Sequence, residues 1–525
     1  MNSIPSIFND VIGPVMRGPS SSHCAAALRI GRMCRDLMDG NLINVYIEYD
    51  PNGSLATTHK SQGSDMGIFG GLMGWEAYDE RLPDAENFLE SEGIFVHIEI
   101  KDIQASHPNT YKIILHNDIE KHSLTAISTG GGMIEVIDID QNKVSMNGDY
   151  YETLIYCNHP KVVESFILKN LSISHLSLHT GKICFLSLKT QDKIAVDKIE
   201  QIKQLAGVSK IKVINPVLPI KARKNIEVPF STCQEMLAFN ADKDFALWEL
   251  AVKYEAMRGD ISENEVFEMM RDIVKIMEQA IQTGLKGTYY DDRILGSQSL
   301  LFNENLQSKK LLGGDANNLI TLYVSATMEV KSSMGIIVAA PTAGSCGALP
   351  GAIFGLAHAM NLPEDEIIKA MLTAGLIGVF ITKNATFAAE VGGCMAETGS
   401  AGGMAAAALV GMKGGTLEQA IAAASLALQN SLGLICDPIG NRVEAPCLGR
   451  NVMAASNAVS SANMALSDYA HLIPLDEVIV TMKEVGDQIH HTLRCTNLGG
   501  LSVTQAAKKI EFNLENAQVK FYKSC

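Results

Sequence analysis

The chain has 525 residues, of which 47% are hydrophobic and 19% are charged. This composition describes a well-packed globular protein of about two to four domains, and it excludes a disordered chain. A formal net charge of −15 argues against nucleic acid and against an anionic membrane surface as partners. Eleven irregularly spaced cysteines do not fit a secreted disulfide framework, and no apolar signal segment follows Met1. We therefore expect a protein of the reducing cytoplasm.

Residues 1–150 predict an N-terminal α+β domain. A helix is expected over 25–38, where apolar residues recur with helical spacing. Three consecutive glycines at 130–132 indicate a turn that a ligand or another backbone could approach closely. Apolar or alternating runs predict strands over 44–48, 96–100, 111–115 and 133–139.

Residues 151–220 have a different pattern, which reads strand, helix, strand, strand, helix, strand. This order is typical of a ferredoxin-like βαββαβ module. Such a module could bind an amino acid or pair with another subunit, and the fold alone does not decide between these uses. A short linker is expected over 221–230, at the end of a proline-containing stretch without periodicity.

Residues 231–525 predict an all-helical domain, so the whole chain is expected to be a multidomain α+β protein. Gly and Ala are abundant in this part, which favours helices in close contact. The segment at 416–432 opens with Thr-Leu-Glu-Gln, a capping-box pattern. Helices are expected over 243–285, 363–381, 416–432 and 476–492.

The stretch 334–360 has no Asp, Glu, Lys or Arg and is long enough to span a bilayer. However, Pro341, Pro350 and five glycines between 335 and 355 interrupt it. We therefore expect a buried, broken segment near a site instead of a membrane span.

Three cysteines in the last third of the chain are the strongest indication of chemistry. Cys394, Cys436 and Cys447 each lie among small residues, and none belongs to a Cys-x-x-Cys pair. Three thiolates from separate loops suit a 4Fe–4S cluster with one iron unclaimed by protein, which could act as a Lewis acid on a substrate oxygen. The alternative is three buried, inert cysteines, because a free cysteine packs as a small hydrophobic residue.

Several polar groups are candidates for substrate binding. Ser20, Ser21, Ser22 and His23 immediately precede the first helix, where hydroxyls and backbone N–H groups could cradle a carboxylate. The simpler interpretation is that Ser22 caps the helix and His23 faces solvent. Further candidates in loops or at helix starts are Asp65, which is also an ordinary helix-capping residue, His107, Thr342 and Asn384.

With these motifs the chain resembles the iron–sulfur-dependent L-serine dehydratases over nearly its whole length. The stretches 18–23, 107–109 and 128–132 resemble the β part of that family, and 151–220 resembles the ACT-type module of some members. The α part is matched at Ala340-Pro341-Thr342-Ala343-Gly344, Lys383-Asn384-Ala385, Gly393-Cys394, Cys436-Asp437-Pro438 and Pro446-Cys447.

The resemblance implies a lyase that converts L-serine, and L-threonine as a second substrate, into the keto acid and ammonia without pyridoxal phosphate. Cys394, Cys436 and Cys447 would ligate a 4Fe–4S cluster, with Cys525 as a candidate fourth ligand and Cys495 as its rival. It also implies an amino-acid effector at the ACT-like module and a homodimer.

The chain departs from the family pattern at several positions. Gln62 stands where members usually have a histidine, so the base would be His59, His23 or His107. Cys24 replaces a common threonine, and Cys495 replaces the glutamate of an Arg-Glu-Thr segment. Two alternatives remain open: a related L-cysteine desulfidase or β-eliminase, and a non-catalytic amino-acid or iron sensor.

Overall fold

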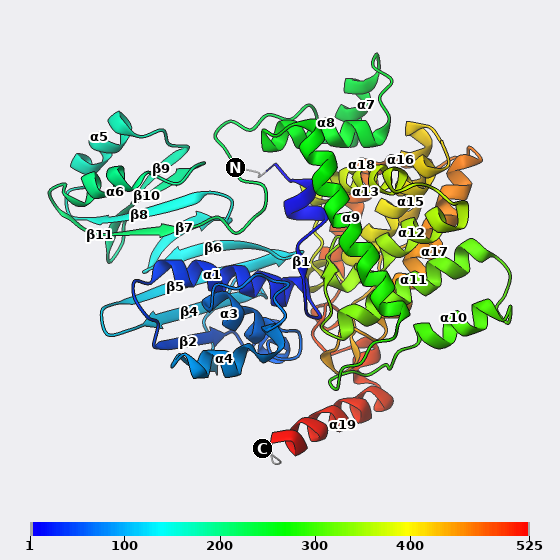
Figure 1. Cartoon of the computed structure of the whole chain (residues 1–525), viewed down its shortest axis with the longest axis horizontal. Coiled ribbons are helices and arrows are strands. Elements are labelled where there is room, and N and C mark those ends of the chain that lie inside the picture. The colour runs from blue at the N-terminus through cyan, green and yellow to red at the C-terminus, as the bar shows by residue number, and fades with distance from the viewer. Residues whose placement is uncertain (1–3, 523–525) are drawn as a thin grey trace.

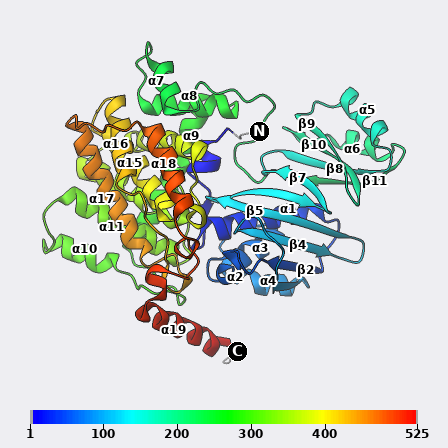
Figure 2. The same ribbon diagram turned by 180° about the vertical axis from the view of Figure 1, so that it is seen from behind.

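The computed structural model describes residues 4–522 and contains two β-sheets and a large helical part. In Figure 1 the two sheets lie on one side, one above the other, and the helical part lies beside both of them. The view from behind shows the same arrangement (Figure 2). The mixed α and β architecture with a helical C-terminal part agrees with the fold class expected from the sequence.

The lower sheet is six-stranded, in the order β3-β2-β4-β5-β6-β7, and only the β2–β3 pair is parallel. Helix α1 (Ala26–Leu37) packs on β5 and β6, and α3 (Ser64–Leu72) packs against α1. The short elements α2 (Leu55–Thr58), η3 (Leu82–Asp84) and α4 (Ala85–Ser91) complete this part. The strands are β2 (Asn44–Tyr49), β3 (Phe95–Ile100), β4 (Thr110–His116), β5 (Lys121–Gly130), β6 (Met133–Ile139) and β7 (Asn142–Met146).

The expected helix and the four expected strands of this part are confirmed to within two residues at each end. The sequence did not predict β5 and β7. In β5 the buried side chains alternate strictly, but they include His122 and Ser128. These polar residues hide the apolar periodicity by which a half-buried strand is recognised.

The upper sheet has the expected βαββαβ element order. Its four strands are antiparallel in the order β11-β8-β10-β9. Residues of β8 alternate between two cores: Leu154 and Tyr156 join the large core of the molecule, whereas Ile155 and Cys157 join a small core beneath the two helices. The elements are β8 (Tyr151–Cys157), α5 (Pro160–Asn170), β9 (His175–Thr180), β10 (Cys184–Thr190), α6 (Val196–Lys203) and β11 (Val208–Ile214).

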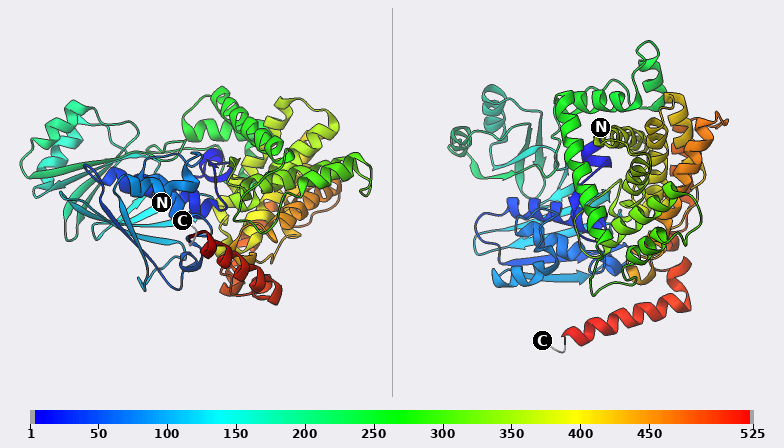
Figure 3. Two further views of the ribbon diagram at one scale, coloured as in Figure 1. Left: turned by 60° about the horizontal axis from the view of Figure 1, so that its bottom comes forward. Right: turned by 45° about the vertical axis from the view of Figure 1, so that its right-hand side comes forward.

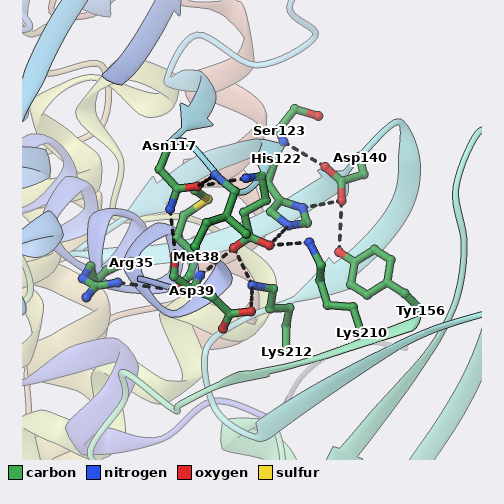
Figure 4. Close-up of polar contacts among 12 residues, drawn as sticks. Arg35, Met38, Asp39, Asn117, His122, Ser123, Asp140, Tyr156, Lys210 and Lys212 are labelled. Atoms are coloured by element: carbon green, nitrogen blue, oxygen red, sulfur yellow. Dashed lines mark hydrogen bonds and ion pairs between the residues drawn. The ribbon is translucent and has the colours of Figure 1, made fainter. Parts of the chain in front are cut away.

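A buried polar network joins the two sheets (Figure 4). The Glu120 carboxylate accepts hydrogen bonds from the ammonium groups of Lys210 and Lys212 and from the Asp39 amide. Burial opposes the charge on Glu120, but the amide and the two lysines outweigh it and lower the pKa of Glu120 to about 2. Beside it, His122 Nδ1 lies 2.7 Å from Asp140 Oδ2, to which Tyr156 donates.

The helical part follows the upper sheet in the chain and contains the elements from α7 to α19. They are α7 (Cys233–Asn240), α8 (Leu247–Gly259), α9 (Glu263–Leu285), α10 (Ser299–Gln307), α11 (Asp315–Ser332), β12 (Ile337–Val338), η4 (Ala343–Ser345), α12 (Ala348–Met360), α13 (Glu364–Asn384), α14 (Ala389–Gly392), η5 (Met395–Gly399), α15 (Ser400–Met412), α16 (Leu417–Gln429), η6 (Ile439–Asn441), α17 (Cys447–Leu466), α18 (Leu475–Gln488), η7 (His491–Leu493), η8 (Gly500–Val503) and α19 (Gln505–Tyr522). Helix α19 extends away from the body in both views of Figure 3.

Two details of this part differ from expectation. The single helix expected over 243–285 is wrong, because α8 ends at Asp260, which has φ 57°, and Ser262 then caps α9 through Glu265. The part is also not wholly helical, since β12 pairs with β1 (Val15–Met16). The capping box at Thr416 is confirmed by its hydrogen bonds with Gln419.

The N-terminal segment ties the two halves of the molecule together. Besides the β1–β12 pair, η1 (Ile7–Val11) packs against α13, and the Ile7 amide donates to the buried Glu255 carboxylate of α8. One continuous hydrophobic core therefore includes residues of the six-stranded sheet and of the helical bundle. The stretch 334–360 is part of that core, and no helix within residues 4–522 is long and apolar enough to cross a membrane.

We predict that Lys212→Met weakens the contact between the two sheets by about 3 kcal/mol, because it leaves the buried Glu120 carboxylate with one partner fewer. Hydrogen exchange in β8 and β11, together with denaturant unfolding, measures the loss. Since the pKa of Glu120 is lowered to about 2, the wild-type contribution is complete above about pH 5 and disappears as the pH falls through 2. Lys203→Met, which breaks an exposed pair with Glu200, is the control and costs at most about 1 kcal/mol. Equal effects of the two substitutions would contradict the prediction.

Candidate functional site

A cavity with about 310 Å³ of empty space lies where the N-terminal part meets the helical bundle. Ser20 and Gln62 reach it from the N-terminal part, and the other lining residues come from the helical part. They are Gly344, Ala389, Glu390, Glu397, Cys436, Pro438, Val443, Cys447 and Cys495.

The three sequence-predicted cysteines come together from different elements: Cys436 and Cys447 line this cavity, and the Cys394 thiol contacts that of Cys436. Cys394 lies between α14 and η5, Cys436 lies in the loop after α16, and Cys447 is the first residue of α17. All three are buried. The turn before Cys394 requires glycine at 393, which has φ 71°, and a Cβ there would lie 2.7 Å from the Leu434 carbonyl.

Cys495 is a fourth cysteine of the same site. Its amide donates to the Cys436 carbonyl at 2.9 Å, and the Cys436 amide donates to the Leu493 carbonyl at 2.9 Å. This short backbone bridge brings the Cys495 thiol into contact with that of Cys436. Cys495 adopts φ 61°, an uncommon conformation for a residue other than glycine. The other candidate for a fourth ligand, Cys525, lies outside the described residues.

A carboxyl group and a guanidinium group accompany the thiols. Ligand atoms of Cys394, Glu397 and Cys436 lie within 4.8 Å of one another, a spacing that could hold a metal ion. Arg450 contacts the Cys394 sulfur at 3.4 Å and pairs with Asp437 at 2.5 Å. A hydrogen bond with Cys436 and the charge of Arg450 lower the pKa of the Cys394 thiol. Burial, followed by the charge of Cys394, raises the pKa of Glu397 well above its usual range.

The hydrogen bonds of His23 define its tautomer. Thr58 donates its hydroxyl proton to the Ser54 carbonyl at 2.6 Å, so its oxygen must accept from His23 Nε2, 2.9 Å away. In the neutral form of His23 the lone pair is then on Nδ1, which would accept from the Ser20 hydroxyl 2.9 Å away. Burial lowers the pKa of His23, which favours this neutral form. Ser20 in turn lines the cavity, so a basic nitrogen stands directly behind a cavity hydroxyl.

The other two serines have different partners. Ser21 accepts from the Ala343 amide at 3.1 Å, which joins the N-terminal part to the loop at 342–345. Ser22 donates to Glu390 at 2.8 Å. The simple capping interpretation of this segment is wrong: Ser20 occupies the cap position of η2 (Ser21–Ala25), no side chain of the segment caps it, and His23 is fully buried.

Gln62 occupies the cavity wall and is 1% exposed. Its Nε2 donates to the Cys495 sulfur at 3.7 Å, whereas its Oε1 has no hydrogen-bond partner. His59 instead hydrogen-bonds Asp65 at 2.7 Å and packs on Tyr49. Asp65 thus orients His59 and does not cap α3, whose cap is Gly63.

The remaining sequence candidates differ in their distance from the cavity. Thr342 donates to Glu397 at 2.8 Å and so supports the cavity wall. His107 is partly buried, accepts from the Asn109 amide, and is near enough to Glu390 to feel its charge. Asn384 is exposed at the end of α13 and is not one of the described residues that line the cavity.

Sequence reasoning missed Glu390, Glu397 and Arg450 as members of the site. A signal existed, because the two glutamates flank Cys394 in Glu-Val-Gly-Gly-Cys-Met-Ala-Glu. Both are buried or nearly so, which is rare for unpaired glutamate outside functional sites.

Comparisons with known proteins agree with this site. A family model described as "Serine dehydratase alpha chain" matches residues 242–502. A probable L-serine dehydratase alpha chain from Bacillus subtilis is 37% identical over 94% of its own length and 54% of this chain. The L-serine dehydratase alpha chain of Peptoniphilus asaccharolyticus is 37% identical over 96% of its length and 53% of this chain.

An L-serine dehydratase from Helicobacter pylori is 27% identical over 98% of its length and 96% of this chain, so the similarity extends to the N-terminal part and the middle module. The match to the Bacillus subtilis alpha chain covers 94% of that relative at 37% identity. The family expected from the sequence motifs is therefore confirmed, and the chain belongs to the L-serine dehydratases.

Proposed function

We propose that this protein is an L-serine ammonia-lyase of the iron–sulfur type, which converts L-serine into pyruvate and ammonia. The observation that carries the proposal is the convergence of four buried cysteines on a cavity that is also lined by Ser20, Gln62 and Glu390. Relatives named L-serine dehydratase support the same activity.

The donor set fits a 4Fe–4S cluster. Cys394, Cys436 and Cys447 supply three soft thiolate ligands from separate loops, as such clusters require. Two buried polar atoms at the cavity, Gln62 Oε1 and Glu390 Oε2, have no partner within the described chain. Buried polar atoms are rarely left unpaired in native proteins, so these two support a cavity built to be filled.

Substrate binding and the elimination of water are assigned to the cluster and to side chains of the protein. When bound, the cluster would supply a Lewis acid that makes the hydroxyl of serine a better leaving group. The backbone N–H groups at the start of η2 would hold the substrate carboxylate, which leaves the Ser20 hydroxyl for its contact with His23. Loss of water leaves aminoacrylate, whose imine tautomer hydrolyses to pyruvate and ammonia.

We assign proton abstraction to the Ser20–His23 pair. The Cα proton of serine moves to Ser20 Oγ while the Ser20 hydroxyl proton moves to His23 Nδ1, which has its lone pair directed at that hydroxyl. His59 is the weaker of the three histidine candidates, because Asp65 engages its Nδ1 and it does not belong to the described cavity wall. His107 lies beyond Asn109 and is likewise not part of that wall.

Cys495 is the fourth ligand that we propose in place of Cys525. It is 4% exposed, it touches Cys436, and it lines the same cavity. A thiolate there would supply a fourth soft ligand to the cluster.

Several further expectations stay predictions. They are the domain limits 1–150, 151–220 and 231–525 with a linker at 221–230, an amino-acid effector at the ACT-like middle module, assembly into a homodimer, and a location in the cytoplasm.

We predict that Cys394→Ser, Cys436→Ser and Cys447→Ser each abolish cluster binding, because three obligatory ligands leave no redundancy. Iron content and absorption spectra of anaerobically purified protein measure this. Cys233→Ala is the matched control, since Cys233 is buried in α7, away from the cavity, and should keep full iron occupancy.

Full iron occupancy in any one serine variant would remove that cysteine from the ligand set. Assays with L-serine and L-cysteine on the wild-type protein distinguish the lyase from a desulfidase. An iron-loaded protein that releases pyruvate from neither substrate would favour the sensor.

We also predict that His23→Gln lowers kcat at least about a hundredfold, the scale expected for loss of a general base, while His59→Gln changes kcat less than about tenfold. Because burial lowers the pKa of His23 below its ordinary value of 6.5, the wild-type rate should stay constant as the pH falls through 6.5 and decline only at lower pH. Steady-state kinetics across pH test both statements. A severe loss in His59→Gln with a mild one in His23→Gln would transfer the role to His59.

A further inference from the structure

Glu390 has a free carboxylate oxygen in the cavity wall. It is the second residue of α14, and its side chain is 4% exposed. One oxygen, Oε1, accepts from Ser22 at 2.8 Å and lies 3.6 Å from His23 Nδ1. The other oxygen, Oε2, is buried and has no hydrogen-bond partner.

The cationic groups around Glu390 leave its Oε2 without a hydrogen bond. His23 Nδ1 lies 3.6 Å from the other oxygen, Oε1, and burial lowers the pKa of His23, which favours its neutral form. The Arg450 guanidinium is engaged by Asp437 and Cys394. The buried Lys331 ammonium, which is near enough to Glu397 to act on its charge, donates to the Val443 carbonyl.

The second carboxyl group of the cavity differs from Glu390. Glu397 accepts from Thr342, and its carboxyl oxygen lies within 4.8 Å of the Cys394 and Cys436 sulfurs, so it belongs with the thiols. Glu390 Oε2, which has no hydrogen-bond partner, is therefore the carboxylate oxygen that can receive a cation. A buried anion without a partner is costly, and a small cationic group that hydrogen-bonds its free oxygen removes that cost.

We propose that Glu390 is the specificity residue that binds the α-ammonium group of the amino-acid substrate through Oε2. This inference rests on the proposed function and adds the group that distinguishes an amino acid from a hydroxy acid. Ser22 engages Oε1, whereas Oε2 has no partner, and Glu390 is one of the residues that line the cavity. With the backbone N–H groups of η2 at the carboxylate and Glu390 Oε2 at the ammonium, the cavity would recognise both charged ends of L-serine.

The test compares two ligands that differ only in the ammonium group and cannot lose water. L-Alanine and propionate are titrated calorimetrically into anaerobic, cluster-loaded protein. Wild-type protein should bind L-alanine at least about tenfold more tightly than propionate. Glu390→Gln, which keeps the shape and removes the charge, should weaken L-alanine about ten- to a hundredfold and leave propionate unchanged. The KM for L-serine should rise by the same factor.

Two controls accompany the variant. Glu418→Gln changes an exposed glutamate of α16 and should keep the wild-type preference. Glu390→Asp retains the charge on a shorter side chain and should retain part of the preference, which separates loss of charge from misfolding.

Each contrary result has its own meaning. A preference for L-alanine that survives in Glu390→Gln overturns the assignment and leaves the proposed function intact. A fall in kcat with an unchanged preference overturns it as well and makes Glu390 part of proton transfer. Wild-type protein that binds neither ligand and does not convert L-serine would overturn the proposed function together with this inference.

Discussion

The site depends above all on the docking of the N-terminal part against the helical bundle, because neither part contains the whole cavity. Ser20 and Gln62 come from one side, and Glu390 and the cysteines from the other. The docking is held by the β1–β12 pair and by direct hydrogen bonds such as Ser22 to Glu390. Gly130 permits it sterically, since a Cβ there would lie 3.0 Å from Ala388. The glycine turn expected from the sequence is thus approached closely by another backbone segment.

The second constraint is the burial of ionisable groups in and beside the cavity wall. The cavity wall combines thiols, carboxyl groups and an amide, and several of the groups in and beside it are paired. Asp437 accepts from Arg450 and also from the Leu501 amide at 2.6 Å. Burial and the charge of Cys394 raise the pKa of Glu397 and so oppose its ionisation. Gln62 Oε1 and Glu390 Oε2 have no hydrogen-bond partner, and both residues line the cavity.

The sequence allowed much of this to be predicted, for reasons that particular residues show. Helix α1, the βαββαβ order and the Thr416 cap follow from local patterns, which is why they were recognised. Strand β5 was missed because its buried face includes His122 and Ser128. The three cysteines proposed as ligands were found by their small-residue surroundings, whereas Glu390 was not, since its proposed role depends on contacts with Ser22 and His23 more than 360 positions away. No local rule predicts a contact of that separation.

Two departures from the family pattern lie against each other in the structure. Gln62 replaces a usual histidine and Cys495 replaces a usual glutamate, and Gln62 Nε2 donates to the Cys495 sulfur at 3.7 Å. A pair that could titrate near neutral pH has therefore become an amide–thiol pair that cannot exchange a proton in the same way. This pair agrees with the proposal that Cys495 is a soft ligand and that proton transfer belongs to Ser20 and His23, whose Oγ and Nδ1 atoms lie 2.9 Å apart.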